Sequence, residues 1–130
     1  MAPPSRRSTA DPHRPRGPEG VVRSGGRKTW WRVATRASRI RILSTSCLEA
    51  VLVAEGSTDA FADAGSDTHR IVDLAAAMLT VPAAGGAVID VHGRPLEIDP
   101  DLTRRWSGVV AATPELAEEL ADAIRGTERR

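Results

Sequence analysis

One acidic residue, Asp73, lies near the start of a run of apolar and small residues that ends at Gly85 and Gly86. The run reads I-V-D-L-A-A-A-M-L-T-V-P-A-A-G-G. A helix that is apolar on nearly every side is typical of a buried element. A carboxylate where such a helix begins can bind a metal ion, or it can cap the helix by accepting backbone N–H groups. The residues alone leave both roles open for Asp73.

Two adjacent tryptophans, Trp30 and Trp31, suggest a different chemistry. Aromatic rings can stack on nucleic-acid bases while neighbouring cations bind the phosphates. A solvated linker has the same composition, and we favour that interpretation over a nucleic-acid partner. The flanking cations are Arg27, Lys28, Arg32 and Arg36.

The formal net charge of +1 hides an uneven distribution. Residues 1–39 contain ten Arg or Lys and two Asp or Glu, whereas residues 40–130 contain eight basic and fifteen acidic residues. Five of the nine prolines lie in the first eighteen residues, which have almost no large apolar side chains to bury. This composition predicts a disordered Arg/Pro-rich leader over 1–38 and a folded domain over 39–130.

The composition also narrows the class of protein. A length of 130 residues favours one folded domain, and the single cysteine, Cys47, rules out a disulfide within one chain. We expect a reducing, cytoplasmic setting. The basic N-terminus lacks the apolar segment of a secretory signal, and no apolar run is long enough to cross a membrane.

From residue 39 onward, strand-like and helix-like patterns alternate, which predicts an α/β (α+β) fold. Leu48, Val51 and Leu52 have helical spacing, and Pro82 predicts a distorted last turn in the apolar run. Gly85 and Gly86 are expected to provide a left-handed helix end. We expect strands at 39–43, 57–63, 87–91 and 106–112, and helices at 46–55, 73–84 and 114–125, the last capped by Thr113.

Four motifs stand in a fixed order along this segment. Residues 41–46 read R-I-L-S-T-S, residues 53–56 read V-A-E-G, residues 59–63 read D-A-F-A-D, and residues 73–86 run from the aspartate to A-G-G. In this order they resemble the C-terminal signature of the inositol monophosphatase superfamily, which includes the archaeal-type fructose-1,6-bisphosphatases. Val72 and Ala83 depart from that signature, where Trp and Glu are common.

The resemblance implies the C-terminal half of a layered α-β-α-β-α sandwich and Mg²⁺-dependent hydrolysis of a phosphorylated sugar or inositol. It implies that Asp73 is a metal ligand and that Asp63 contacts substrate hydroxyls. Read without the resemblance, Asp63 is a solvated residue at a strand end. Ser44, Thr45 and Ser46 would line the substrate pocket, although residues of these types are also ordinary helix caps.

An absence limits what the resemblance implies. The family has an N-terminal half with a catalytic Glu and an Asp-Pro-Ile/Leu-Asp-Gly-Thr segment, and residues 1–38 contain neither. We therefore expect an incomplete form, inactive by itself, with apolar helix faces left exposed, and we assign no catalytic residue. A homodimer would only duplicate the same partial set of ligands. The alternative hypothesis is a small interaction module that binds a partner or nucleic acid through its basic arm.

Overall fold

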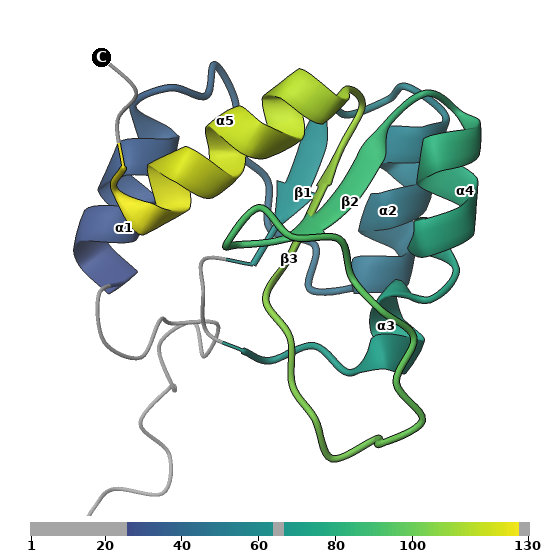
Figure 1. Cartoon of the computed structure of the whole chain (residues 1–130). Helices are drawn as coiled ribbons and strands as arrows, with labels where there is room; N and C mark the ends of the chain where they lie inside the picture. The colour runs from purple at the N-terminus through teal and green to yellow at the C-terminus, as the bar shows by residue number, and fades with distance from the viewer. Residues whose placement is uncertain (1–25, 64–66, 128–130) are drawn as a thin grey trace, which may run out of the picture.

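A three-stranded antiparallel sheet lies between two layers of helices in the computed structural model, which describes residues 26–63 and 67–127 (Figure 1). The strands are β1 (Ala60–Ala62), β2 (Ala87–Asp90) and β3 (Gly108–Ala111), and they lie side by side in the order β1-β3-β2. Each lies within a segment predicted as a strand. The structure therefore confirms the α+β class.

The central strand, β3, holds the sheet together. All four of its residues are buried, and both other strands pair with it. Val110 pairs with Phe61 on one side and with Val88 on the other. A strand buried on both faces needs apolar side chains throughout, which the G-V-V-A sequence supplies.

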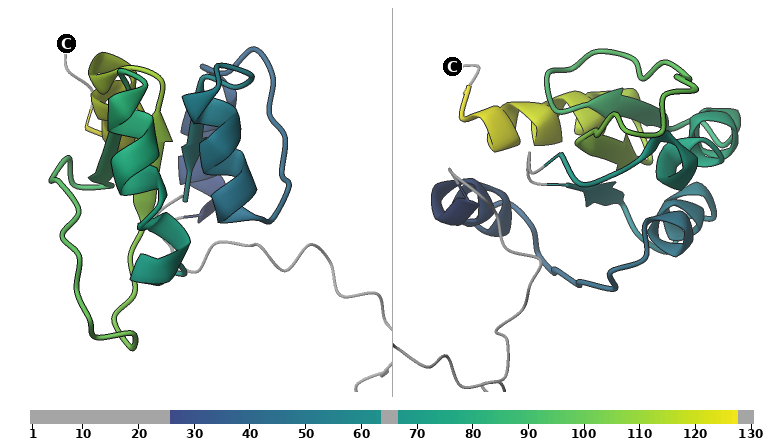
Figure 2. Two further views of the ribbon diagram at one scale, coloured as in Figure 1. Left: turned by 90° about the vertical axis from the view of Figure 1, so that its right-hand side faces the viewer. Right: turned by 90° about the horizontal axis from the view of Figure 1, so that it is seen from below.

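One face of the sheet is covered by α2 (Ser46–Ala54) and α4 (Ala77–Ala83), and the short α3 (Ile71–Leu74) packs against α2 (Figure 2). α2 and α4 pack against each other as well as against the strands. The core on this face is apolar throughout, so the hydrophobic effect drives the assembly of this layer. Its buried members include Ala50, Val53, Leu74, Val81, Trp106 and Val110.

The opposite face is covered by α5 (Pro114–Arg125), which packs against all three strands, and α1 (Gly26–Ala34) lies beside it (Figure 2). α5 begins as predicted: the Thr113 hydroxyl accepts a hydrogen bond from Leu116 N at 3.2 Å, and Pro114 is the first helical residue. Gly126, with a φ of 77°, ends the helix in the left-handed conformation that favours glycine.

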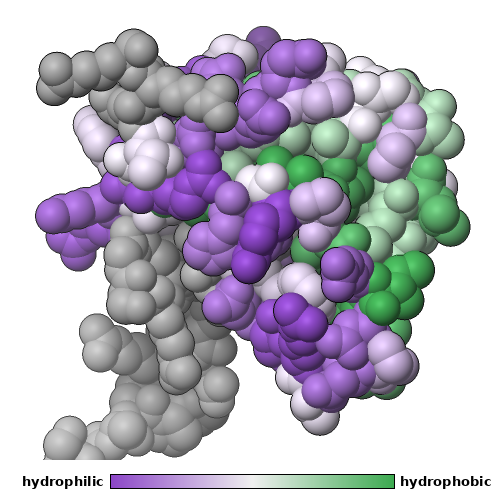
Figure 3. All heavy atoms as spheres, in the orientation of Figure 1, coloured by the Kyte–Doolittle hydropathy of each residue, from purple (hydrophilic) through white to green (hydrophobic). Residues whose placement is uncertain are grey.

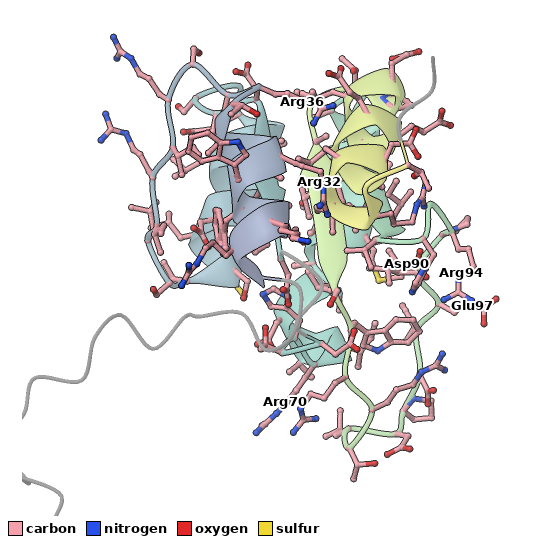
Figure 4. The ribbon with its side chains drawn as sticks, turned by 90° about the vertical axis from the view of Figure 1, so that its left-hand side faces the viewer. Arg32, Arg36, Arg70, Asp90, Arg94 and Glu97 are labelled. Atoms are coloured by element: carbon pink, nitrogen blue, oxygen red, sulfur yellow. The ribbon has the colours of Figure 1, made fainter. Side chains whose placement is uncertain are left out.

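Helix α1 corrects the expectation of a disordered leader over 1–38. Residues 26–34 form a helix that packs against α5, so that expectation is wrong for them; residues 1–25 lie outside the described part. Arg32 reaches across to α5, where its Nε and Nη2 donate to Ala123 O and Ile124 O, each at 2.7 Å (Figure 4). These carbonyls are left without partners at any helix C-terminus, and α1 satisfies them. Val33 adds apolar packing to the same core.

Two other element predictions need correction. The expected strand at 39–43 is irregular and exposed, because no described strand lies beside it and its Leu43 N–H donates to Glu49 Oε1 at 3.3 Å instead. The expected helix at 73–84 begins earlier and is interrupted at Ala75 and Ala76, which keep helical backbone angles although α3 ends and α4 begins there.

The end of α4 agrees with the sequence. Pro82 lies in its last turn. Gly85 has the predicted left-handed backbone, with a φ of 91°, and Gly86 N donates to Val81 O at 2.9 Å. None of the helices in the described part is long and apolar enough to cross a lipid bilayer.

Candidate functional site

Asp73 is the third residue of α3 and is half-buried. Its Oδ2 accepts a hydrogen bond from Arg70 N at 2.8 Å, so the carboxylate closes the first turn of its own helix. Within the described residues, Oδ1 has no hydrogen-bond partner. The two roles left open by the sequence are therefore compatible, because one oxygen caps the helix and the other remains available to a ligand.

The start of α2 lies next to Asp73. Cys47 Sγ is 3.8 Å from Asp73 O, so the residues that begin α2 share one end of the helix layer with the carboxylate. Thr45 is the cap residue of α2, but its side chain makes no capping hydrogen bond. Ser44 has a φ of 59°, which is uncommon outside glycine and turns the chain sharply into Thr45 and Ser46. The structure thus places Cys47, the residue after Ser46, against the backbone of Asp73, and a substrate pocket lined by Ser44, Thr45 and Ser46 stays a prediction.

Asp63 lies away from solvent, which the sequence did not predict. It follows β1, and its side chain is 4% exposed. Its Oδ2 accepts hydrogen bonds from Thr68 Oγ1 at 2.7 Å and Thr68 N at 3.3 Å, and His69 Nδ1 lies 3.4 Å away. These contacts hold Thr68 and His69, which lead into α3. The role of Asp63 in binding substrate hydroxyls stays a prediction, whereas its role in positioning these two residues is visible.

A complete metal site is not formed by the described residues alone. They contain no group of three or more His, Cys, Asp or Glu side chains that could hold a metal ion. Mg²⁺ requires about six oxygen ligands, of which proteins usually supply one or two carboxylates. The carboxylate of Asp73 is suited to be one of these ligands. The residues described here therefore do not fit a catalytic Mg²⁺ site by themselves.

A surface hollow lies at the other end of α2, about 13 Å from the helix start for nine residues at about 1.5 Å each. The C-terminal ends of α2 and α4 meet there, and Glu55 is the one charged residue among the described residues that line it. Helix C-termini carry partial negative charge and repel anions. This hollow is therefore not a phosphate site, and the start of α2 is the better candidate.

An ion pair that the sequence did not predict joins the buried Asp90 to the exposed Arg94 (Figure 4). Asp90 Oδ1 accepts from His92 N at 2.8 Å and Arg94 N at 2.9 Å, and Oδ2 accepts from Arg94 Nε at 2.8 Å. Burial raises the pKa of Asp90, but the hydrogen bonds from the backbone and side chain of Arg94 and from the backbone of His92 outweigh it and lower the pKa. The sequence signal was an aspartate four residues before an arginine, with Gly93 between them. The pair stabilises the turn after β2.

The family model for the inositol monophosphatase family matches residues 9–129. This chain belongs to the inositol monophosphatase family. The match begins inside the segment predicted as a separate leader, and it covers the start of α2, Asp63 and Asp73.

Individual relatives agree with this assignment. A fructose-1,6-bisphosphatase/inositol-1-monophosphatase of Methanothermobacter thermautotrophicus is 40% identical over 86 residues, which are 66% of this chain and 30% of the relative. An inositol-1-monophosphatase of Aeropyrum pernix is 36% identical over 86 residues, 66% of this chain and 32% of the relative. The chain therefore spans about a third of the length of these relatives.

Solved structures agree on the fold. A hypothetical protein from Pyrococcus horikoshii with similarities to inositol-1 monophosphatase has a TM-score of 0.64 at 27% identity, and the match covers 77% of this chain and 38% of that one. An extragenic suppressor from Pyrococcus furiosus has a TM-score of 0.63 at 25% identity, over 68% of this chain and 37% of that one. Residues 39–130 are about 71% of the chain, so a match over 77% extends into the first 38 residues.

Proposed function

We propose that this chain contributes the C-terminal portion of a Mg²⁺-dependent phosphate monoester hydrolase that acts on a phosphorylated sugar or inositol. Family membership and the names of the relatives support the reaction class. The observation that carries the proposal is the position of Asp73, with Oδ1 unpartnered among the described residues, beside the uncapped start of α2.

The start of α2, beside Asp73, has the chemistry to bind a phosphate ester. The first N–H groups of a helix bind anions because they lack intrahelical partners and carry partial positive charge. Bound Mg²⁺ supplies charge neutralisation and activation of water in such hydrolases. One carboxylate does not hold that ion, so the remaining ligands must come from a part of the family fold that the described residues do not include.

A covalent chimera tests this proposal. The N-terminal portion of the M. thermautotrophicus relative is joined by a flexible linker to the full chain, and phosphate release is measured from inositol 1-phosphate and fructose 1,6-bisphosphate. We expect Mg²⁺-dependent turnover that falls by about a hundredfold in Asp73→Asn, because asparagine keeps the cap but loses the charge that a metal requires. Glu97→Gln, an exposed carboxylate in the loop before β3, is the matched control.

The result that would refute the proposal is a folded chimera without turnover, or one in which Asp73→Asn is as active as Glu97→Gln. The ratio of the two substrate rates identifies the preferred phosphate ester. We also retain a cytoplasmic setting and a homodimer as predictions, the latter tested by sedimentation of the chain alone.

The alternative of a basic arm that binds a partner or nucleic acid is less well supported. Trp31 is 71% exposed and lies in α1 with the exposed Arg27 and Lys28. However, Arg32 is engaged in binding the end of α5, and Arg36 donates to Arg32 O at 3.1 Å. Titration with a labelled single-stranded oligonucleotide tests the idea, which predicts an affinity that falls steeply with added salt.

A further inference from the structure

The described helices differ sharply in charge. In α2, α3 and α4 together, two of twenty residues are charged and both are acidic, whereas in α1 and α5 eight of twenty-one are charged. The charged residues of α1 are all Arg or Lys, while α5 has four acidic residues and one arginine. Figure 3 shows the contrast on one side of the molecule, where hydrophilic residues gather around α1 at the left and hydrophobic residues over α4 at the right. Among the described helices, α1 is therefore the one suited to an anionic partner.

The positive charge continues along the chain after this helix. Residues 26–43 contain six Arg or Lys and no Asp or Glu. A basic segment of this kind is attracted to nucleic acid or to the anionic headgroups of a lipid bilayer. Charge alone does not separate these two partners, so the arrangement of the exposed side chains must decide between them.

Helical spacing divides α1 into an inner and an outer side. Thr29 is buried and Val33 packs into the core beneath α5, so these two residues mark the inner side. At about 100° per residue, Arg27, Lys28 and Trp31 lie together on the opposite side of the helix. Both cations are exposed, and Trp31 is 71% exposed. We define the basic face as Arg27, Lys28 and Trp31.

The two cations of the basic face are not used inside the described part of the fold. Within it, neither Arg27 nor Lys28 makes a hydrogen bond or an ion pair. Arg32, by contrast, points toward α5 and donates to backbone carbonyls there (Figure 4). All three residues of the basic face line one surface hollow, whose edge is Arg32. The helix therefore spends one cation on its own packing and presents two cations and an indole to a partner.

We propose that the basic face docks the chain reversibly on the surface of an anionic lipid bilayer, with the Trp31 indole at the level of the headgroups. An indole favours this interface because its ring is amphipathic. Each Arg or Lys close to an anionic leaflet strengthens binding by about fivefold. Residues 40–130 contain eight basic and fifteen acidic residues, so the same leaflet repels that part of the chain and orients α1 toward the lipid.

A single exposed ring favours a lipid surface over single-stranded nucleic acid. Proteins that bind single strands stack successive bases on several aromatic side chains. The chain has three Trp, one Phe and no Tyr. Trp106 is buried, and Trp30 and Phe61 are half-buried, so Trp31 is the chain's one exposed aromatic ring. One indole between two cations provides no platform for successive bases, but it is sufficient for a headgroup layer.

Vesicle binding by the full chain tests the inference. The probes are vesicles of phosphatidylcholine mixed with phosphatidylserine, and vesicles of phosphatidylcholine alone. Co-flotation measures the bound fraction, and tryptophan emission measures the polarity around Trp31. We expect binding to the anionic vesicles only, together with a blue shift of the emission. Added salt should weaken the binding, because it screens exposed charges.

Substitution of the two cations separates the basic face from the rest of the charge. The double variant Arg27→Gln, Lys28→Gln should weaken binding by about twentyfold, since each cation contributes about fivefold. The matched control is Arg70→Gln, Arg105→Gln, which removes the same charge from exposed residues outside α1. The control should bind within about threefold of the unmodified chain, because its charges lie away from the leaflet.

Substitution of the indole tests its position at the headgroups. Trp31→Ala should remove the blue shift and weaken binding, because no other exposed ring can enter the interface. Its matched control is Leu79→Ala, which shortens an apolar side chain of equal exposure on the other helix layer. The control should retain both the binding and the blue shift.

Several results would overturn the inference: no binding to anionic vesicles at low salt, equal binding to both kinds of vesicle, a double variant that binds as well as its control, or a blue shift that survives in Trp31→Ala. Displacement from the vesicles by a single-stranded oligonucleotide, at a lower phosphate concentration than that of the anionic lipid, would assign the basic face to nucleic acid. Binding that appears only where sedimentation shows self-association would assign it to a second copy. None of these readouts involves catalysis, so the inference is independent of the proposed hydrolase function.

Discussion

Replacing Arg32 by alanine should separate α1 from α5. The guanidinium donates to Ala123 O and Ile124 O at 2.7 Å each, and to Thr29 Oγ1 at 3.1 Å. Hydrogen bonds from a charged group stabilise by about 1.5–3 kcal/mol each, and a cation at a helix C-terminus adds about 0.3–1 kcal/mol. Arg32 is half-buried, so water can replace some of the hydrogen bonds that the guanidinium makes. We therefore expect Arg32→Ala to lower the free energy of unfolding by about 2–4 kcal/mol.

Urea unfolding, followed by circular dichroism and by tryptophan fluorescence, measures this loss. The control is Lys28→Ala, an exposed cation in the same helix, which should change stability by less than about 0.5 kcal/mol. Arg32→Lys should fall between the two, since an ammonium keeps the charge but lacks the planar fork that spans two carbonyls.

If Arg32→Ala is no less stable than Lys28→Ala, then the two carbonyl contacts do not hold α1 against α5. That outcome would restore the expectation that residues 1–38 are separate from the folded domain. Deleting 1–38 should, by the same reasoning, destabilise the remainder by at least as much as Arg32→Ala, because it also removes the packing of Val33.

Two further substitutions test the packing and the electrostatics in the same urea assay. Gly86→Ala should destabilise by about 1–3 kcal/mol, because its Cβ would lie 2.3 Å from Ala111 O and 2.7 Å from Val81 Cγ1. The control is Gly56→Ala, where an added Cβ meets open space but the backbone φ is 85°. This substitution should lower the free energy of unfolding by about 1 kcal/mol through backbone strain alone. Asp90→Asn should cost about 1–3 kcal/mol at pH 7. Folding lowers the pKa of Asp90, so the stability that its carboxylate contributes is present above the unfolded pKa and is lost as pH falls through the folded pKa. The difference in free energy of unfolding between the unmodified chain and Asp90→Asn should therefore shrink in acid. A difference that is constant with pH would contradict the lowered pKa.

The elements that the sequence predicted correctly are those with local signals. Thr113 and Pro114 specify the start of α5 whatever surrounds them, and the short β-branched stretch of β2 favours a strand by itself. The segment at 39–43 shows the limit of such signals. Alternation of Ile with Arg predicts a strand, but a strand also needs a neighbour, and the described sheet offers none there.

The candidate site was predictable only in part. The resemblance placed Asp73 and Ser44–Ser46 in one pocket, which stays a prediction; the structure shows that Cys47, next to Ser46, contacts the backbone of Asp73. The contacts of Asp63 with Thr68 and His69, five and six residues later, follow from no spacing in the sequence. Helix α1 was missed because its stability comes from capping α5, more than 80 residues away in the chain.

The central position of β3 has a consequence for how the protein is made. β1 and β2 do not pair with each other, and each depends on β3, which lies after both in the chain. While the ribosome is still producing residues before Gly108, neither early strand has a partner and the apolar helices α2 and α4 have no complete sheet to cover. The sheet therefore cannot form until β3 has been made, and the apolar surfaces of α2 and α4 stay exposed in the nascent chain until then.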